Sequence, residues 1–387
     1  TKKGELAEAQ KLYEAILKNF SNNVRAKQGL AALIKSNQNN IIQNRPEEVI
    51  DQLVSLYNQG QITTVIKQAE ILTEQYPNSA VIWNILGASR AKIGMLDEAI
   101  DAYKKSVSLN PDFAEAYSNM GVALKNQDKL DESIEAFKKS ILLKPNDADS
   151  YYNMGITLNH QGKVDETISA YKKAISLNPD FAKAYNNLGL VLQVKGMSDE
   201  AIEACKKAIS LNPHHAEAYN SLGIALQDKG KSEEALKAYK KAISLKPDYT
   251  EVLSNIGNIL KDQVRLEEAF ESYNKALLLK PNDADIYYNL ANILHDLGRL
   301  DEAEFNFRQA MLFRPDFAEA HHNLSFTLLN NGKLKEGLDQ LEWRWKNPEF
   351  LSSKERNFLQ LQWDGIQSLH DKRIMIWCEQ GIGDTLN

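Results

Sequence analysis

Asparagine is the residue type whose spacing in this chain could bind a ligand repeatedly. Its carboxamide donates and accepts hydrogen bonds, so one side chain can pair with a peptide unit without contacting that peptide's side chains. One row of asparagines recurs every 34 residues, with Ser221 in place of one member. Its members are Asn119, Asn153, Asn187, Asn255, Asn289 and Asn323. This asparagine row predicts a surface that holds an extended peptide by its backbone. The alternative is a row of solvated polar side chains that binds nothing.

The remaining composition argues against several other classes of function. The 387 residues contain 46 basic and 52 acidic side chains, and the net charge of −6 excludes an unselective nucleic-acid binder. The two cysteines, Cys205 and Cys378, exclude a disulfide framework and fit a reducing compartment, which predicts a cytoplasmic protein. No apolar run approaches the roughly 18 residues of a membrane span. No spacing of histidines and cysteines predicts a metal site, and no nucleophile–base pair is evident.

The sequence around the asparagine row repeats with the same 34-residue period. Eight of the ten prolines are separated by that same interval: Pro77, Pro111, Pro145, Pro179, Pro213, Pro247, Pro281 and Pro315. We therefore divide the chain into nine repeats that begin at 46, 80, 114, 148, 182, 216, 250, 284 and 318, and number the positions of each from 1 to 34. On this numbering the asparagine row occupies position 6 and the prolines occupy position 32.

Small and aromatic residues within the repeat predict two closely packed antiparallel helices. Position 8 is glycine in six repeats and position 20 is small, so two helices can approach closely there. Large residues at positions 4 and 24, mostly aromatic, would seal the pair, and we expect His321 and Cys205 to pack in the same places. Glycine at position 15, as at Gly94, predicts a left-handed residue that ends the first helix. Aspartate or asparagine at position 33, as at Asp112 and Asn146, predicts an N-cap for the next helix.

A 34-residue period with these landmarks resembles the tetratricopeptide repeat, or TPR. The resemblance covers the segment 46–341 and implies an all-α, right-handed superhelical solenoid of helix-turn-helix repeats, each stabilised by its neighbours. In this family position 6 faces the concave groove. The asparagine row is similar to the one that lines the repeat domain of the eukaryotic O-linked N-acetylglucosamine transferase, where extended substrate chains lie. The resemblance therefore implies a protein or peptide partner, and no nucleic acid.

Both ends of the chain depart from the period. Residues 1–45 predict partial helices of an earlier repeat followed by a polar linker, so we expect the array to continue upstream. Residues 342–370 contain Glu342-Trp-Arg-Trp345 and Gln362-Trp-Asp-Gly365, which predict a tryptophan-rich cap and linker. Residues 371–387 predict a strand that runs into Glu379-Gln-Gly-Ile-Gly-Asp-Thr385, a turn typical of the opening of a nucleotide-binding α/β unit.

This order of motifs resembles a family of bacterial TPR proteins that carry a C-terminal two-lobed (GT-B) glycosyltransferase domain related to the heptosyltransferases. The resemblance implies that residues 371–387 begin such a domain, as a short βα stub of a longer parent protein. It also implies that Asp384 is the general base toward an acceptor hydroxyl, and that Gly381 and Gly383 allow close approach of the backbone. A nucleotide sugar would serve the parent protein, and we expect no cofactor for the present chain.

The sequence thus predicts a protein-interaction scaffold that binds an extended peptide in its concave groove. On the glycosyltransferase resemblance it would be the substrate-recognition arm of a parent enzyme. The alternative is a TPR adaptor with no associated enzyme. In either case we expect no catalysis by these 387 residues alone.

Overall fold

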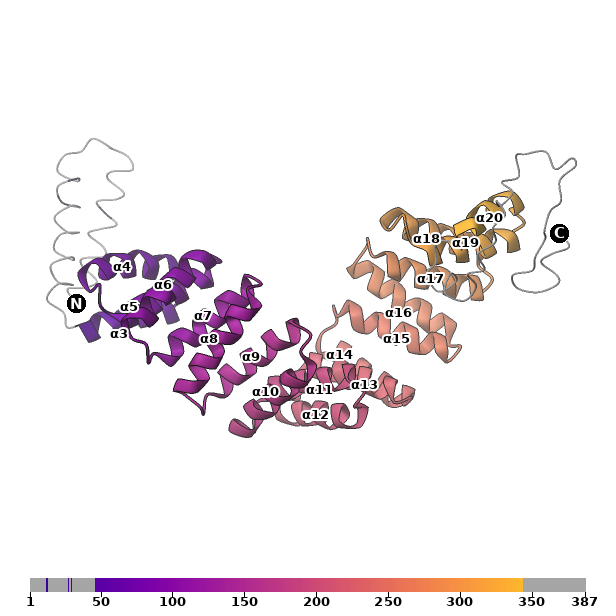
Figure 1. Ribbon diagram of the computed structural model, residues 1–387. Coiled ribbons are helices and arrows are strands. Elements are labelled where there is room, and N and C mark those ends of the chain that lie inside the picture. Colours follow the sequence, from indigo (N-terminus) through magenta and orange to yellow (C-terminus); the bar gives the residue numbers. More distant parts are fainter. Residues whose placement is uncertain (1–11, 13–26, 28, 30–45, 344–387) are drawn as a thin grey trace, which may run out of the picture. The chain divides into compact units, whose positions relative to one another are not determined.

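The computed structural model describes residues 46–343 and the isolated residues Leu12, Lys27 and Gly29. Within this part the chain forms 18 α-helices and no strand (Figure 1), which confirms the all-α prediction there. The predicted strand and turn of residues 371–387 lie outside the described residues, as does most of 1–45. The chain divides after Ile256, within helix α15, into two compact units.

Each repeat contributes a first helix at positions 1–13 and a second helix at positions 17–30, with a shorter second helix in the last repeat. The first helices are α3 (Pro46–Asn58), α5 (Ala80–Lys92), α7 (Ala114–Asn126), α9 (Ala148–His160), α11 (Ala182–Val194), α13 (Ala216–Asp228), α15 (Thr250–Asp262), α17 (Ala284–Asp296) and α19 (Ala318–Asn330). The second helices are α4 (Ile62–Gln75), α6 (Leu96–Leu109), α8 (Leu130–Leu143), α10 (Val164–Leu177), α12 (Ser198–Leu211), α14 (Ser232–Leu245), α16 (Leu266–Leu279), α18 (Leu300–Phe313) and α20 (Leu334–Leu341). These helices span the segment predicted for the array.

The two helices of a repeat meet where a glycine at position 8 lies against the residue at position 24. A Cβ atom on Gly155 would lie 2.6 Å from a ring carbon of Tyr171, and one on Gly121 would lie 2.9 Å from the ring of Phe137. In the second unit the same contact joins Gly257 to Tyr273, at 2.7 Å. These distances are shorter than carbon–carbon contact allows, so in these repeats a side chain at position 8 would force the ring at position 24, or its helix, to move.

Cys205 takes the aromatic position 24 in the repeat that begins at 182. Its sulfur fills the space beside Gly189, where a Cβ atom would lie 2.5 Å away. The thiol is free and buried, and burial raises its pKa to about 12. It therefore packs as a small apolar group, as the sequence predicts, and is a poor nucleophile.

The first helices end in a left-handed residue, as predicted. The position-15 glycines have φ values between 72° and 85°: Gly60, Gly94, Gly162, Gly196, Gly230, Gly298 and Gly332. Two repeats place another residue there, namely Asp128 with φ 61° and Val264 with φ 59°. Aspartate tolerates this conformation, whereas a β-branched valine is strained in it. The Val264 side chain is 77% exposed, so packing does not offset that strain.

The predicted N-caps at position 33 are wrong. The helix after each proline begins three residues later, because position 33 still belongs to the turn that the proline starts, and position 34 is the capping residue. Where position 34 is aspartate it caps: Asp147 accepts a hydrogen bond from the backbone N–H of Ser150 at 3.2 Å. Asp112, at position 33, instead donates its own backbone N–H to Asn110 Oδ1 at 3.1 Å.

Neighbouring repeats are joined by a hydrogen bond between position 14 of one repeat and the carboxylate at position 18 of the repeat before. The pairs are Gln127 to Asp97 (2.8 Å), Gln161 to Asp131 (2.8 Å), Lys195 to Asp165 (2.5 Å), Lys229 to Asp199 and, in the second unit, Asn331 to Asp301 (2.8 Å). The same carboxylates lie in the first turn of a second helix, where negative charge is favourable. They therefore stabilise both their own helix and the stacking of repeats.

We expect Val264→Gly to stabilise the second unit by about 1 kcal/mol, because glycine adopts a positive φ without a steric clash. Hydrogen exchange of the α16 amides measures this change, which should slow exchange about fivefold. The reverse substitution at the equivalent position, Gly298→Val, should speed the exchange of the α18 amides. Faster exchange in Val264→Gly would contradict the strain argument.

Candidate functional site

Four members of the asparagine row already serve the contact between successive first helices. Each donates its side-chain amide to position 5 of the preceding repeat: Asn119 Nδ2 to Asn84 Oδ1 (3.1 Å), Asn187 Nδ2 to the Tyr152 hydroxyl (3.2 Å), Asn255 Nδ2 to Asn220 Oδ1 (3.5 Å) and, in the second unit, Asn323 Nδ2 to the Tyr288 hydroxyl (3.0 Å). The row therefore has a structural role that the sequence analysis did not foresee. The signal was present in the sequence as a polar residue with a long side chain at position 5 of the repeat before.

Asn153 and Asn289 differ from the other four. Both side chains are half-buried, and neither carboxamide makes a hydrogen bond to the described residues. Position 5 of the preceding repeat is serine in both cases, Ser118 and Ser254, and serine has a shorter side chain than asparagine or tyrosine. These two carboxamides keep their full capacity to donate and to accept.

The residue before each of these two asparagines belongs to an aromatic cluster, one cluster in each unit. In the first, the ring centroid of Tyr152 lies 4.7 Å from that of Phe181 and 5.8 Å from that of Tyr171. Burial raises the pKa of Tyr152 above its usual value and outweighs the hydrogen bond from Asn187, which lowers it. The Tyr152 hydroxyl therefore stays protonated, and after accepting from Asn187 it still has one proton to donate.

The second cluster reproduces the first in the repeat that begins at 284. The ring centroid of Tyr288 lies 4.9 Å from that of Phe317 and 6.0 Å from that of Phe307. The amide of Asn323 donates both to the Tyr288 hydroxyl and to Asn292 Oδ1, the latter at 2.8 Å. Each unit thus combines an aromatic ring, a phenolic hydroxyl and an unused carboxamide at positions 5 and 6 of one first helix.

Acidic residues lie one helical turn before most members of the asparagine row, at position 2. These residues are Glu115, Asp149 and Glu251 in the first unit, and Asp285 and Glu319 in the second, while Glu217 precedes Ser221 and Lys183 precedes Asn187. Glu217 is paired with Lys246 at 3.6 Å and Asp285 with Arg314 at 2.6 Å. Glu115 and Asp149 are exposed and form no ion pair with the described residues. Because residues four apart share one face of a helix, Asp149 adds negative charge beside Asn153.

The predicted catalytic residue Asp384 and the loop residues Gly381 and Gly383 lie outside the described residues, so their roles stay predictions. Of the predicted tryptophan-rich cap the structure describes Trp343, whose ring stacks on that of His321 with centroids 3.6 Å apart. Within residues 46–343 no three histidine, cysteine or carboxylate side chains come together as metal ligands would. The described helices also include none with the length and apolar character needed to cross a membrane.

Family models of the tetratricopeptide repeat match much of the described array. One Tetratricopeptide repeat model matches residues 180–248, and a TPR repeat model matches 87–128, 157–196 and 257–298. A further Tetratricopeptide repeat model matches residues 114–147 and 284–317, and another matches residues 136–168. Together these matches include every member of the asparagine row except Asn255 and Asn323.

Individual relatives match the chain only in part. The peroxisomal targeting signal receptor of Candida albicans is 46% identical over 50 residues, which make up 13% of this chain and 8% of the receptor. The solved structure of MamA is 34% identical, with a TM-score of 0.41, and the match covers 44% of this chain and 94% of MamA. The structure of the APC/C hetero-tetramer Cut9–Hcn1 is 19% identical, with a TM-score of 0.52 over 79% of this chain and 61% of that one, and shares the fold.

The two classes of asparagine should respond differently to truncation. We expect Asn187→Ala to destabilise the first unit by about 1 kcal/mol, because the hydrogen bond to Tyr152 is lost. Asn153→Ala should change stability by less than about 0.5 kcal/mol, since its carboxamide bonds to no described residue. Urea denaturation followed by circular dichroism compares the two variants, and equal destabilisation would contradict the division of the row.

Proposed function

The chain is a tetratricopeptide-repeat protein, and we propose that it is an adaptor that binds an extended peptide of a partner protein along the face of its first helices. The observation that carries this proposal is the pair of unused carboxamides, Asn153 and Asn289, each of which follows a tyrosine in the same first helix. Neither carboxamide is among the buried unpartnered groups, so both can exchange water for the N–H and C=O of a peptide.

The spacing of first helices suits an extended peptide. Packed helices lie about 8–10 Å apart, and an extended chain advances about 3.3 Å per residue, so one repeat matches about three peptide residues. Asn153 would pair with the N–H and the C=O of one peptide unit. Asn119 and Asn255 donate to the preceding repeat, but their Oδ1 atoms can still accept from a peptide N–H. The first unit therefore offers contacts at intervals along such a peptide.

The charge beside Asn119 and Asn153 favours a basic peptide at these two repeats, whereas Lys183 precedes Asn187. Glu115 and Asp149 are exposed, carry no ion pair within the described residues and lie one turn before Asn119 and Asn153. Lysine or arginine side chains of the peptide would neutralise them. Such rim contacts add more to the rate and the specificity of association than to affinity.

The comparisons agree with an adaptor. The matched family models describe repeats. The Candida albicans protein that matches over 50 residues is by name a receptor for a targeting signal. That match is confined to 8% of the receptor. We therefore define the partner of this chain by its chemistry, as an extended basic peptide.

A second candidate function rests on the sequence Glu379-Gln-Gly-Ile-Gly-Asp-Thr385. If this motif begins a GT-B domain, the array would be the acceptor-binding arm of a glycosyltransferase, with Asp384 as general base and Gly381 and Gly383 in the loop. The matched models and the described helices all belong to the repeats, so the adaptor is the better-supported proposal. The buried free thiol of Cys205 supports a cytoplasmic location for either function.

The peptide-binding proposal predicts that affinity depends on the asparagines and on the peptide backbone. Peptides selected from a random phage-displayed library against the full chain would be resynthesised, and their affinity measured by calorimetry. We expect Asn153→Ala to weaken binding about three- to tenfold, because two hydrogen bonds to the peptide are lost. Replacing Asn187 or Asn255 should weaken it as well, with helicity retained. N-methylation of single peptide amides should weaken binding at intervals of about three residues.

Asn126→Ala is the matched control, because Asn126 is an exposed asparagine at the end of α7 that bonds to no described residue. Its affinity should equal that of the unmodified chain. Unchanged affinity in all three row variants would show that the row does not bind the peptide.

The two candidate functions are separated by the length of the native protein. Reading the gene beyond Asn387, with intact-mass measurement of the native product, tests this directly. A continuation of several hundred residues with alternating strands and helices is the result that the glycosyltransferase predicts. A stop codon soon after Asn387 would leave the adaptor alone.

A further inference from the structure

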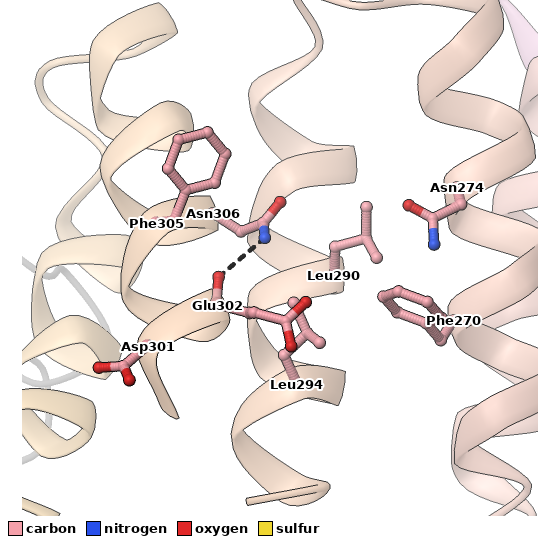
Figure 2. Close-up of a pocket in the computed structure, with 8 residues that line it drawn as sticks. All are labelled: Phe270, Asn274, Leu290, Leu294, Asp301, Glu302, Phe305 and Asn306. Carbon is pink, nitrogen blue, oxygen red and sulfur yellow. Dashed lines mark hydrogen bonds between the residues drawn. The ribbon is translucent and has the colours of Figure 1, made fainter. Parts of the chain in front are cut away.

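A pocket of about 360 Å³ opens in the second unit between the second helices α16 and α18, with the first helix α17 as its floor (Figure 2). It is lined by Phe270, Asn274, Leu290, Leu294, Asp301, Glu302, Phe305 and Asn306. Because second helices form its walls, this pocket does not involve position 5 or 6 of the first helices. It is thus separate from the peptide-binding face proposed above.

The pocket coincides with a reversal of sequence order in α18. At positions 21 and 22, second helices place an apolar residue and then a polar one, as in Ile134-Glu135 of α8 and Phe270-Glu271 of α16. Helix α18 has Glu304-Phe305 instead. The ring of Phe305 is consequently 59% exposed, at a position where six other repeats hold Asp101, Glu135, Ser169, Glu203, Lys237 and Glu271.

Glu304, the acidic residue of this reversed pair, forms ion pairs within the fold. The side chain of Glu304 is only 13% exposed, and it accepts hydrogen bonds from Lys333 Nζ at 2.6 Å and from Arg308 Nη2 at 3.0 Å. Burial alone would raise the pKa of Glu304, but these two cations outweigh it and hold the pKa below its usual value. Phe305 has no such role, since most of its ring contacts solvent. An exposed aromatic ring beside an apolar pocket is typical of a surface that binds a partner.

The interior of the pocket is apolar and partly aromatic. Leu290 and Leu294 are buried in the floor, and Figure 2 shows Phe305 and Phe270 on opposite sides of them. Asn306 donates its amide to the carbonyl oxygen of Glu302 at 2.8 Å, which leaves its Oδ1 free to accept. The carboxamide of Asn274 bonds to no described residue. An apolar site with a few polar groups at its edge is the usual composition of a ligand pocket.

The rim of the pocket is negatively charged. Both oxygens of Glu302 are held by Arg299, at 2.7 and 2.6 Å, and the guanidinium of Arg299 lies 4.7 Å from the centre of the Phe270 ring. Asp301 instead accepts a hydrogen bond at 2.8 Å from the neutral amide of Asn331, so its charge is not neutralised by that contact. Lys333, a cation near Asp301, is bound by Glu304.

We propose that this pocket is a docking site for an aromatic side chain of a partner protein that carries a lysine or arginine next to it. The ring would lie over Leu290 and Leu294 between the two phenylalanines, where offset or edge-to-face contacts are available. The adjacent cation would reach Asp301 at the rim. The proposal commits to a basic partner because the uncompensated charge at the rim is negative.

The test uses the full 387-residue chain and two blocked dipeptides, N-acetyl-phenylalanyl-lysine amide and N-acetyl-phenylalanyl-glutamate amide. Their dissociation constants are measured by saturation-transfer NMR, which detects the millimolar affinities expected for probes of this size. We expect the lysine probe to bind and the glutamate probe to bind at least about threefold more weakly. Failure of the lysine probe to bind at millimolar concentration, or equal binding of both probes, would overturn the proposal.

Three variants locate the site. Phe305→Ser introduces serine, which α10 carries at the equivalent position as Ser169. It should weaken binding of the lysine probe about tenfold. Leu142→Ser is the matched control, because Leu142 is a 71% exposed leucine of the first unit whose repeat position holds serine in four other second helices. It should leave binding unchanged. Asp301→Asn keeps the acceptor for Asn331 and should remove most of the preference for lysine over glutamate. Equal binding by Phe305→Ser and the unmodified chain would show that the probe binds elsewhere.

Discussion

The contact between glycine at position 8 and the ring at position 24 determines how close the two helices of a repeat can lie. At Gly155 and Tyr171 there is no room even for a methyl group, and the same holds for Gly121 and Phe137. Where position 8 is glycine, this contact leaves no room for a Cβ atom on one helix and buries the position-24 side chain of the other, whereas Ala291 and Ser325 take the position in the last two repeats. Because all later elements are built on such hairpins, the spacing of neighbouring repeats and the positions of their polar side chains depend on it.

Polar side chains then join one hairpin to the next. Near the turn between the two helices of a repeat, position 14 binds the carboxylate at position 18 of the repeat before, as Gln127 does with Asp97. On the first-helix side, position 6 binds position 5 of the preceding repeat, as Asn187 does with Tyr152. An asparagine that could bind a peptide can therefore also form a hydrogen bond to the preceding repeat. Whether it remains free depends on one neighbouring side chain, and serine at position 5 is what leaves Asn153 unpaired.

The repeats are alike in backbone and different in surface. Exchanging the order of two residues in α18 leaves the helix intact, yet it moves an acidic side chain inward and an aromatic ring outward. The inward carboxylate is acceptable because Lys333 and Arg308 surround it. A stack of near-identical hairpins can thus acquire an individual binding surface at one repeat, because each repeat contacts mainly its nearest neighbours.

The sequence by itself determined the period, the all-α fold, the helix pairs, the glycine turns and the packing roles of Cys205 and His321, because these follow from local geometry that recurs in every repeat. It misplaced the N-caps by one residue, because position 33 still lies in the turn that follows the proline. It contains the difference between Asn153 and Asn187 as Ser118 or Tyr152 at position 5 of the preceding repeat, but only the structure shows that positions 5 and 6 meet. It contains the exchanged order of Glu304 and Phe305, but the pocket beside Phe305 forms only where three helices meet. Local conformation is encoded in neighbouring residues, whereas the partners of a polar or aromatic side chain are decided by tertiary packing.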